Sequence, residues 1–498
     1  MPVDPALDDF ENLLSDSALG ELVEVTLRPL GPNTYRARSE DGWVVFSRSA
    51  ADGAWVFEEL EVSGRNPLGD QATDRFLGHA HERSMRFPHR STNAYPHAYD
   101  SVAQFFDARY APDLLVTHTA AHFTGGYLGQ HGSLGTVQAR APFLASGAGV
   151  RQLGVVDRAT RVVNIAPTIA ALMGLDPNPA ATGPTGAPRP GAFLARQDGD
   201  TEWDILTGES AGHVVVFLLD GCNANLLNDV IDAGEAPNMA RLLGTGTMFG
   251  RGSIASLPTA TLANHTTAIT GAHPGHSGIL HNNWIEPGAT EPVDLLSLGG
   301  MFTASQHLAA GVETIFEAVH RSRPGAFNAA TFEYCDRGAD FSSFELVRSG
   351  RQDTLPDLDS VDHLSAEHAS FGDLYRFISR VDHQSTTHLL ECWNGAHGDR
   401  LPDLSWCSLA LTDEAGHHSG PHGEGARAAV RDSDARIGDV LEAVERAGVF
   451  DDSAFLVIAD HGMEQADPDL DRTWDSELAS LGVPYSEVGG GFIYLGVD

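Results

Sequence analysis

Three apolar segments of the chain each lead to an aspartate, and this pattern restricts the possible fold more than any other feature. The runs HVVVFLL, WCSLALT and AFLVIA end at Asp220, Asp413 and Asp460. Uninterrupted apolar runs of this length are typical of strands that are buried on both faces of a parallel sheet. Ligands bind at the carboxyl ends of such strands, so the sequence predicts an α/β fold with three carboxylates gathered at one sheet edge.

Histidines follow two of these aspartates at short spacing. His417 lies four residues after Asp413 in DEAGHHSGP, and His461 directly follows Asp460 in DHGM. Mixed aspartate and histidine ligands suit a borderline ion such as zinc better than Mg²⁺ or Ca²⁺, which prefer oxygen alone. Either spacing arises easily by chance in a chain with 23 histidines. The prediction of a metal site therefore depends on their joint occurrence at strand ends.

A threonine at a predicted helix start supplies a candidate nucleophile. The stretch LPTATLANHTTAITGAH predicts a short helix from Thr261 to Thr270 that ends before Gly271. Free N–H groups and the macrodipole at a helix N-terminus favour an anion such as phosphate. Asn264, one turn further on, could point its amide at the same anion. A simple threonine N-cap is the ordinary explanation for such a residue, and only the neighbouring aspartates and histidines favour a catalytic one.

Composition excludes several classes of protein. The formal net charge of −37 and the complete lack of lysine argue against a surface that binds a nucleic-acid duplex. No apolar run approaches the roughly 20 residues of a membrane helix, so we expect no membrane partner. The acidic first residues do not resemble a targeting peptide, and four cysteines without CxxC spacing suggest reduced thiols, which together predict a cytoplasmic protein.

Two segments interrupt the pattern of strands and helices. Residues 177–210 contain NPAATGPTGAPRPG, which is rich in proline, glycine and small residues and predicts a linker. Residues 285–400 show no strong period, and we interpret them as an inserted cap over the site. Side chains at or near this cap are candidate substrate contacts, although core packing is the simpler explanation for each of them: Trp284, Phe332, Tyr334 and Arg337.

Five motifs together resemble the alkaline phosphatase superfamily, and most of all its nucleotide pyrophosphatase/phosphodiesterase branch. They are DG after an apolar strand, APNMARL, LPTATLANHTTAITGAHPGHSGI, DEAGHHSGP and ADHGM, spread over 213–284 and 406–463. The resemblance implies a three-layer α/β sandwich around a central, mostly parallel sheet. It also implies a role for each matching residue: Thr261 as nucleophile, Asn264 as the family's asparagine, one zinc on Asp220, Asp460, His461 and Thr261, and a second zinc on Asp413 and His417.

The family's second zinc takes one further histidine, from an HG dipeptide near the family's C-terminus. No such dipeptide follows DHGM in this chain, but residues 130–175, which begin QHGSLGTVQARAPF, resemble the family's closing segment. We therefore predict a circular permutation in which 1–176 correspond to the family's C-terminal part and 211–498 to its N-terminal and central part. His131 then completes the second site, with His118 and His122 as alternatives. A swapped homodimer would use the same residues.

The resemblance implies a metal-dependent hydrolase of phosphate esters. Its expected substrate is a small phosphorylated molecule, its reaction that of a phosphodiesterase or nucleotide pyrophosphatase, and its intermediate a phospho-threonine at two zinc ions, with Mn²⁺ as the alternative metal. A phosphonate (C–P) hydrolase or a phosphomonoesterase could use the same residues. Sulfatase motifs are missing, and the TLANH context argues against a phosphoglycerate mutase. A metal-binding scaffold that has lost its activity is the non-enzymatic alternative.

Overall fold

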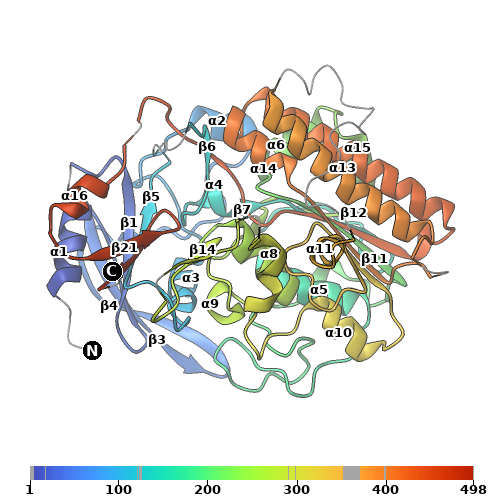
Figure 1. Ribbon diagram of the computed structural model, residues 1–498, viewed down its shortest axis with the longest axis horizontal. Coiled ribbons are helices and arrows are strands. Elements are labelled where there is room, and N and C mark those ends of the chain that lie inside the picture. Colours follow the sequence, from blue (N-terminus) through green and yellow to red (C-terminus); the bar gives the residue numbers. More distant parts are fainter. Residues whose placement is uncertain are drawn as a thin grey trace.

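Two β-sheets organise the protein in the computed structural model (Figure 1). The candidate site lies at the carboxyl ends of strands of the larger sheet. The smaller sheet lies beside the larger one, next to both ends of the chain in Figure 1. The structure describes residues 5–16, 18–120, 122, 126–289, 291–297, 299–351, 371–397, 400–470 and 472–496.

The larger sheet has eight strands in the order β17-β16-β18-β11-β19-β8-β12-β9. All its neighbouring pairs are parallel except the two that involve β8, which is antiparallel to both β19 and β12. This arrangement confirms the predicted mostly parallel sheet. The strands are β8 (Phe143–Gly147), β9 (Gly154–Val156), β11 (His213–Leu219), β12 (Gly246–Phe249), β16 (Asn328–Thr331), β17 (Phe341–Ser342), β18 (Leu404–Leu409) and β19 (Ser453–Ile458).

Helices flank this sheet in two groups, which confirms the three-layer architecture (Figure 1). One group packs around α15, whose apolar face is buried at Val430, Ile437, Leu441 and Val444. This group comprises α6 (Ala224–Asp232), α7 (Pro237–Gly244), α13 (Asp373–Trp393), α14 (Leu411–Ser419) and α15 (Glu424–Arg446). The other group comprises α5 (Ile165–Leu172), α8 (Thr261–Thr270) and α10 (Ile315–Ser322). Among the described residues, no helix is both long enough and apolar enough to cross a bilayer.

The smaller sheet has seven antiparallel strands in the order β21-β22-β5-β1-β2-β3-β4. Both the first and the last part of the chain contribute to it, so part of residues 1–176 lies in this second sheet. The strands are β1 (Val23–Gly31), β2 (Thr34–Ser39), β3 (Gly42–Ala51), β4 (Ala54–Gly64), β5 (Leu114–His118), β21 (Tyr485–Val488) and β22 (Phe492–Leu495). Short helices accompany it: α1 (Pro5–Leu14), α3 (Ala98–Phe105) and α16 (Asp475–Ala479).

Residues 285–400 are more than an inserted cap. They contribute β16 and β17 to the edge of the large sheet, and α13 packs against β16 and β18. The strand NAAT is short and built of small residues, so it carries no period that sequence reasoning could detect. Residues 290, 298, 352–370 and 398–399 of the predicted cap lie outside the described residues.

The predicted linker 177–210 is packed rather than loose. Leu194 and Ile205 are fully buried in the main core, and the carboxylate of Asp198 bonds the side chains of Arg196 and His276. The proline and glycine content of this segment therefore sets its turns without separating it from the domain.

Candidate metal and phosphoryl site

Three neighbouring strands place the three aspartates close together at one edge of the sheet. β18, β11 and β19 are adjacent and parallel, so their carboxyl ends lie at the same edge of the sheet. Asp220 directly follows β11, Asp460 lies two residues beyond β19, and Asp413 lies in the first turn of α14, just after β18. The convergence expected from the three apolar runs is therefore present.

The first cluster brings together residues that are far apart in the sequence. His131 Nε2 lies 3.2 Å from His417 Nε2 and 3.7 Å from Asp413 Oδ1, and His417 Nε2 lies 3.3 Å from Asp413 Oδ2. Backbone carbonyls hold the opposite ring nitrogens, Thr259 O at 2.8 Å from His131 Nδ1 and Gly129 O at 2.8 Å from His417 Nδ1. Both imidazoles are thereby oriented with Nε2 toward the carboxylate.

The second cluster lies deeper. His461 Nε2 is 3.1 Å from Asp460 Oδ2 and 3.8 Å from Asp220 Oδ1. Thr261, the first residue of α8, places Oγ1 3.4 Å from the same nitrogen. The helix spans Thr261–Thr270 and ends at Gly271 with a φ of 64°, as the sequence predicted. The nucleophile candidate thus faces the two clusters from a helix N-terminus.

The candidate ligands differ in exposure. The side chains of Asp413 and His417 are 18% and 16% exposed, whereas those of Asp460 and His461 are fully buried. The ring of Tyr127, which is 40% exposed, lies 4.8 Å from the ring of His417.

The buried carboxylates lack matching positive charge. Burial and the neighbouring Asp460 raise the pKa of Asp220 to about 7, and burial raises the pKa of Asp460 to about 6. Burial alone would also raise the pKa of Asp413, but the charge and hydrogen bond of His417, together with the charges of His131 and His461, outweigh burial and lower that pKa. The atoms Asp220 Oδ1, Asp413 Oδ1 and Asp460 Oδ2 are buried without a hydrogen-bond partner in the described part of the chain.

These donors fit divalent cations. Two groups of ligand atoms each lie within 4.8 Å of one another, His131 with Asp413 and His461, and Asp220 with His265 and Asp460. Unpaired carboxylate oxygens of this kind are costly unless a cation compensates them. Histidine nitrogens mixed with carboxylate oxygens are the donor set that zinc accepts.

The structure contradicts the role predicted for Asn264. Its side chain is fully buried, and Nδ2 donates to the carbonyls of Pro258, Ser256 and Ala260 at 2.8, 3.2 and 3.3 Å. Its Oδ1 accepts the backbone N–H of Ser256 at 2.8 Å. Both ends of the amide are used to hold the loop before α8, so Asn264 cannot bind a phosphoryl oxygen.

A different asparagine lies at the helix N-terminus. Asn282 Oδ1 accepts the backbone N–H of Leu262 at 3.0 Å, which places its amide beside Thr261. No hydrogen bond of Asn282 Nδ2 is found within the described ranges. Sequence reasoning missed this residue because it lies 20 positions from Leu262, outside any local helical spacing.

The predicted substrate contact Trp284 is also corrected. Its side chain is fully buried and stacks against Tyr110, with ring centroids 5.8 Å apart. It belongs to the core because a large apolar ring in this short β14 segment (Asn283–Trp284) packs inward. Arg337 bonds Glu317 and the carbonyl of Val312 instead of facing the site.

Phe332 and Tyr334 line a small apolar cavity of about 190 Å³ beside Asp220 and His265.

Neither alternative to His131 reaches the cluster. His118 Nε2 bonds the backbone carbonyl of His131 at 3.0 Å, and His122 Nε2 bonds the carbonyl of Arg472 at 3.1 Å. His118 therefore supports the segment that carries His131.

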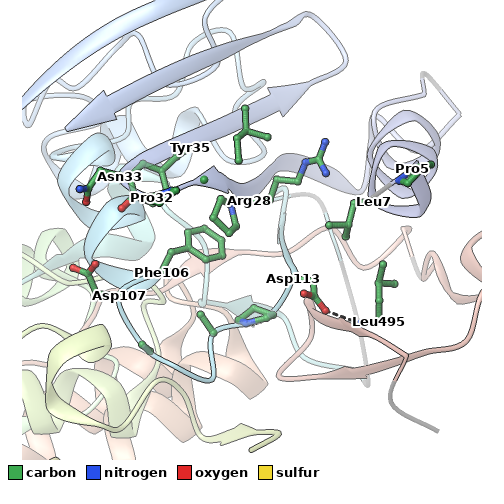
Figure 2. A pocket seen from close by; sticks show the side chains of 16 residues that line it. Pro5, Leu7, Arg28, Pro32, Asn33, Tyr35, Phe106, Asp107, Asp113 and Leu495 are labelled. Atoms are coloured by element: carbon green, nitrogen blue, oxygen red, sulfur yellow. Dashed lines mark hydrogen bonds between the residues drawn. The ribbon is translucent and has the colours of Figure 1, made fainter. Parts of the chain in front are cut away.

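A large surface cavity of about 1090 Å³ lies elsewhere, among β1, β2 and the loop after α3 (Figure 2). None of its lining residues belongs to the candidate site. Its charged groups are already paired, Arg28 with Asp8 and Glu11, and Asp113 Oδ2 with the N–H of Leu495 at 2.8 Å. This cavity provides no chemistry for the reaction.

Comparison with known proteins identifies the family. The sequence profile of the type I phosphodiesterase/nucleotide pyrophosphatase family matches residues 214–479, more than half of the 498-residue chain. The chain belongs to this family. The matched range contains all the candidate ligands except His131.

Individual relatives are more distant. Ectonucleotide pyrophosphatase/phosphodiesterase family member 3 of Rattus norvegicus is 24% identical over 257 residues, which cover 51% of this chain and 25% of that protein. The Mus musculus protein is 24% identical over 258 residues, with the same coverage. The match therefore spans about a quarter of the length of these relatives.

Two solved structures are similar to part of this chain. Murine ectonucleotide pyrophosphatase/phosphodiesterase 5 in complex with AMP is 17% identical, covers 57% of this chain and 66% of its own, and gives a TM-score of 0.38. Phosphonoacetate hydrolase from Sinorhizobium meliloti in complex with phosphonoformate is 21% identical, covers 51% and 57%, and gives a TM-score of 0.34.

Proposed function

We propose that this protein is a metal-dependent phosphoric ester hydrolase, of the phosphodiesterase or nucleotide pyrophosphatase type, with Thr261 as its nucleophile. One observation carries the proposal. The Thr261 hydroxyl stands at the N-terminus of α8, 3.4 Å from His461 Nε2, within a set of aspartates and histidines drawn from three adjacent strands. The family to which the chain belongs supports the same reaction class.

Two groups of residues would hold the ions. Asp220, Asp460, His461 and Thr261 would bind one, and Asp413, His417 and His131 the other, with zinc as the expected metal and manganese as the alternative. Such ions, when bound, lower the pKa of a coordinated hydroxyl and neutralise negative charge on a phosphoryl group. A strongly acidic chain without lysine has few other means of attracting a phosphate ester.

The chemical steps then use residues of the chain itself. The Thr261 hydroxyl loses its proton to solvent and its oxygen attacks phosphorus, so that a P–O bond to Thr261 forms and the bond to the leaving alcohol breaks. The alcohol leaves with a proton from solvent. Water then attacks the phospho-threonine, which returns the hydroxyl of Thr261 and releases the phosphoryl product. The amide of Asn282, whose Oδ1 accepts the Leu262 N–H at the start of α8, would bind the oxygen on which charge develops.

The circular permutation belongs to this proposal. His131 lies outside the range that the family profile matches, yet its Nε2 is 3.2 Å from that of His417 in the same chain. The segment that follows it contributes β8 to the large sheet, next to β19. A second copy of the chain is therefore not needed to complete the site, although a homodimer is compatible with it.

Hydrolysis assays with three substrates test the proposal. Purified protein loaded with Zn²⁺ or Mn²⁺ should hydrolyse bis-p-nitrophenyl phosphate faster than p-nitrophenyl phosphate or phosphonoacetate, and should contain two ions per chain by elemental analysis. Preference for either of the other substrates would assign a phosphomonoesterase or a phosphonate hydrolase. Full metal content without hydrolysis of any of them would favour a binding scaffold.

A further inference from the structure

His265 shares an orientation with the three candidate ligand histidines. In His131, His417 and His461 a backbone carbonyl holds Nδ1, at 2.8 to 2.9 Å, and Nε2 faces the site. In His265 the carboxylate of Glu333 holds Nδ1 at 2.9 Å. Its Nε2 is buried without a hydrogen-bond partner among the described residues. His265 was not predicted to have a function, and neither was Glu333.

Glu333 is fixed in one orientation. Its side chain is fully buried, and Oε2 accepts both His265 Nδ1 and the hydroxyl of Ser408, the latter at 2.8 Å. Its Oε1 accepts the backbone N–H of Cys335 at 3.0 Å. A buried carboxylate with three donors is rigid, because each displacement would leave one of them unpaired.

The fixed ring contacts two candidate metal ligands. His265 Nε2 lies 3.7 Å from Asp220 Oδ2 and 4.0 Å from Asp460 Oδ2. The other oxygen of Asp220, Oδ1, lies 3.8 Å from His461 Nε2. Asp220 therefore turns one oxygen toward His265 and the other toward the group that contains His461 and Thr261.

We propose that Glu333 and His265 form a positioning pair, which holds the carboxylate of Asp220 so that Oδ1 is directed at the ion beside Thr261. This inference rests on the proposed function, since it assumes that Asp220 is a ligand. Outer-shell partners of this kind usually contribute 10- to 100-fold in metal affinity. The pair would act on the nucleophile-side ion and leave the ion at Asp413 largely unaffected.

Metal titration of substituted proteins tests the pair. Glu333→Ala should weaken the binding of the Zn²⁺ beside Thr261 by about 10- to 100-fold, as measured by competition with a chromophoric chelator. Glu333→Gln keeps an acceptor for His265 Nδ1 and should fall between Glu333→Ala and the wild type. Asp434→Asn is the matched control, because Asp434 is a buried carboxylate that bonds Asn238 and Met239 and touches no candidate ligand.

Each result decides the question. A Glu333→Ala protein that still binds two ions at saturation, but with weaker affinity, would support positioning. Its melting temperature without metal should then be lowered no more than that of Asp434→Asn. Wild-type affinity in both Glu333 variants would overturn it and leave the proposed function intact. His265→Asn that binds only one ion at saturation would make His265 a ligand and would also overturn it. A wild-type protein that binds no ion and hydrolyses nothing would instead refute the proposed function. If Glu333→Ala does not fold, Ser408→Ala, which removes one donor to Glu333, should show a smaller loss of affinity.

Discussion

His131 and His417 bring their Nε2 atoms to within 3.2 Å of each other although 286 residues separate them in the chain. Asp413 lies beside both, at 3.7 Å from His131 and 3.3 Å from His417. One polypeptide therefore assembles this cluster from its first and last thirds. The arrangement makes the intrachain form of the site directly testable.

A mixing experiment separates the intrachain site from a swapped dimer. His131→Asn and His417→Asn should each lower the zinc content from two ions to one and reduce activity at least about 10²-fold. A refolded mixture of the two variants should stay inactive, because every chain carries one defective cluster. Recovery of about a quarter of the wild-type activity in the mixture would indicate exchange of His131 between subunits.

Thr261→Ala should abolish turnover without loss of metal. Removal of a nucleophile costs far more than removal of a binding group, so we expect a decrease in kcat of at least about 10³-fold. Thr266→Ala is the control on the same helix, because its hydroxyl only bonds the carbonyl of Leu262 at 2.7 Å. Stopped-flow release of p-nitrophenol measures both. Near-normal turnover in Thr261→Ala would remove the nucleophile assignment.

The two asparagines should respond in opposite ways. Asn282→Ala should lower kcat by about 10²- to 10³-fold, because its amide is proposed to bind the reacting oxygen. It should lower the free energy of unfolding by only about 1 kcal/mol, for the lost hydrogen bond to the Leu262 N–H. Asn264→Ala should instead lower the free energy of unfolding by about 2 to 3 kcal/mol, since it leaves several buried backbone groups unpaired. Urea unfolding and steady-state kinetics on both variants check this. A larger kinetic effect from Asn264 at unchanged stability would restore its predicted role.

His276 should make stability depend on pH. It bonds Asp198 through Nδ1 at 2.6 Å and Asp107 through Nε2 at 2.8 Å. Burial opposes its protonation, but the charge of Asp198 and the hydrogen bonds to Asp107 and Asp198 together outweigh burial and raise the pKa of His276 from 6.5 to about 9. The folded state binds this proton more tightly than the unfolded state does. The stabilisation is therefore complete below about pH 6.5 and is lost as the pH rises through about 9.

The free energy of unfolding should accordingly fall by up to about 3 kcal/mol between pH 6 and pH 10 from this group. In His276→Gln the decrease over the same range should be smaller by that amount. Urea unfolding at the two pH values measures both proteins. An equal decrease in the wild type and the variant would contradict the assignment of this proton to His276.

The central parallel strands and the candidate ligands at their ends could be predicted from the sequence. Apolar runs that end in Asp220 and Asp460 are local signals, because a strand buried on both faces needs no polar alternation. The helix Thr261–Thr270 was predicted to the residue, since Gly271 adopts the positive φ that ends it. Short spacings also placed His417 and His461 next to their aspartates, and the resemblance to the family pointed to His131.

Other features were decided only by the tertiary structure. The sequence does not distinguish the roles of Asn264 and Asn282. In the folded protein the amide of Asn264 bonds the loop before α8, whereas Asn282 bonds the N–H of Leu262, next to Thr261. Glu333 meets His265 across 68 residues, and Trp284 turns into the core rather than toward a substrate. Short-range patterns encode strands, helices and their ends, because these depend on neighbouring residues. Which side chains share a hydrogen bond across the fold depends on packing between distant elements, and no local period records it.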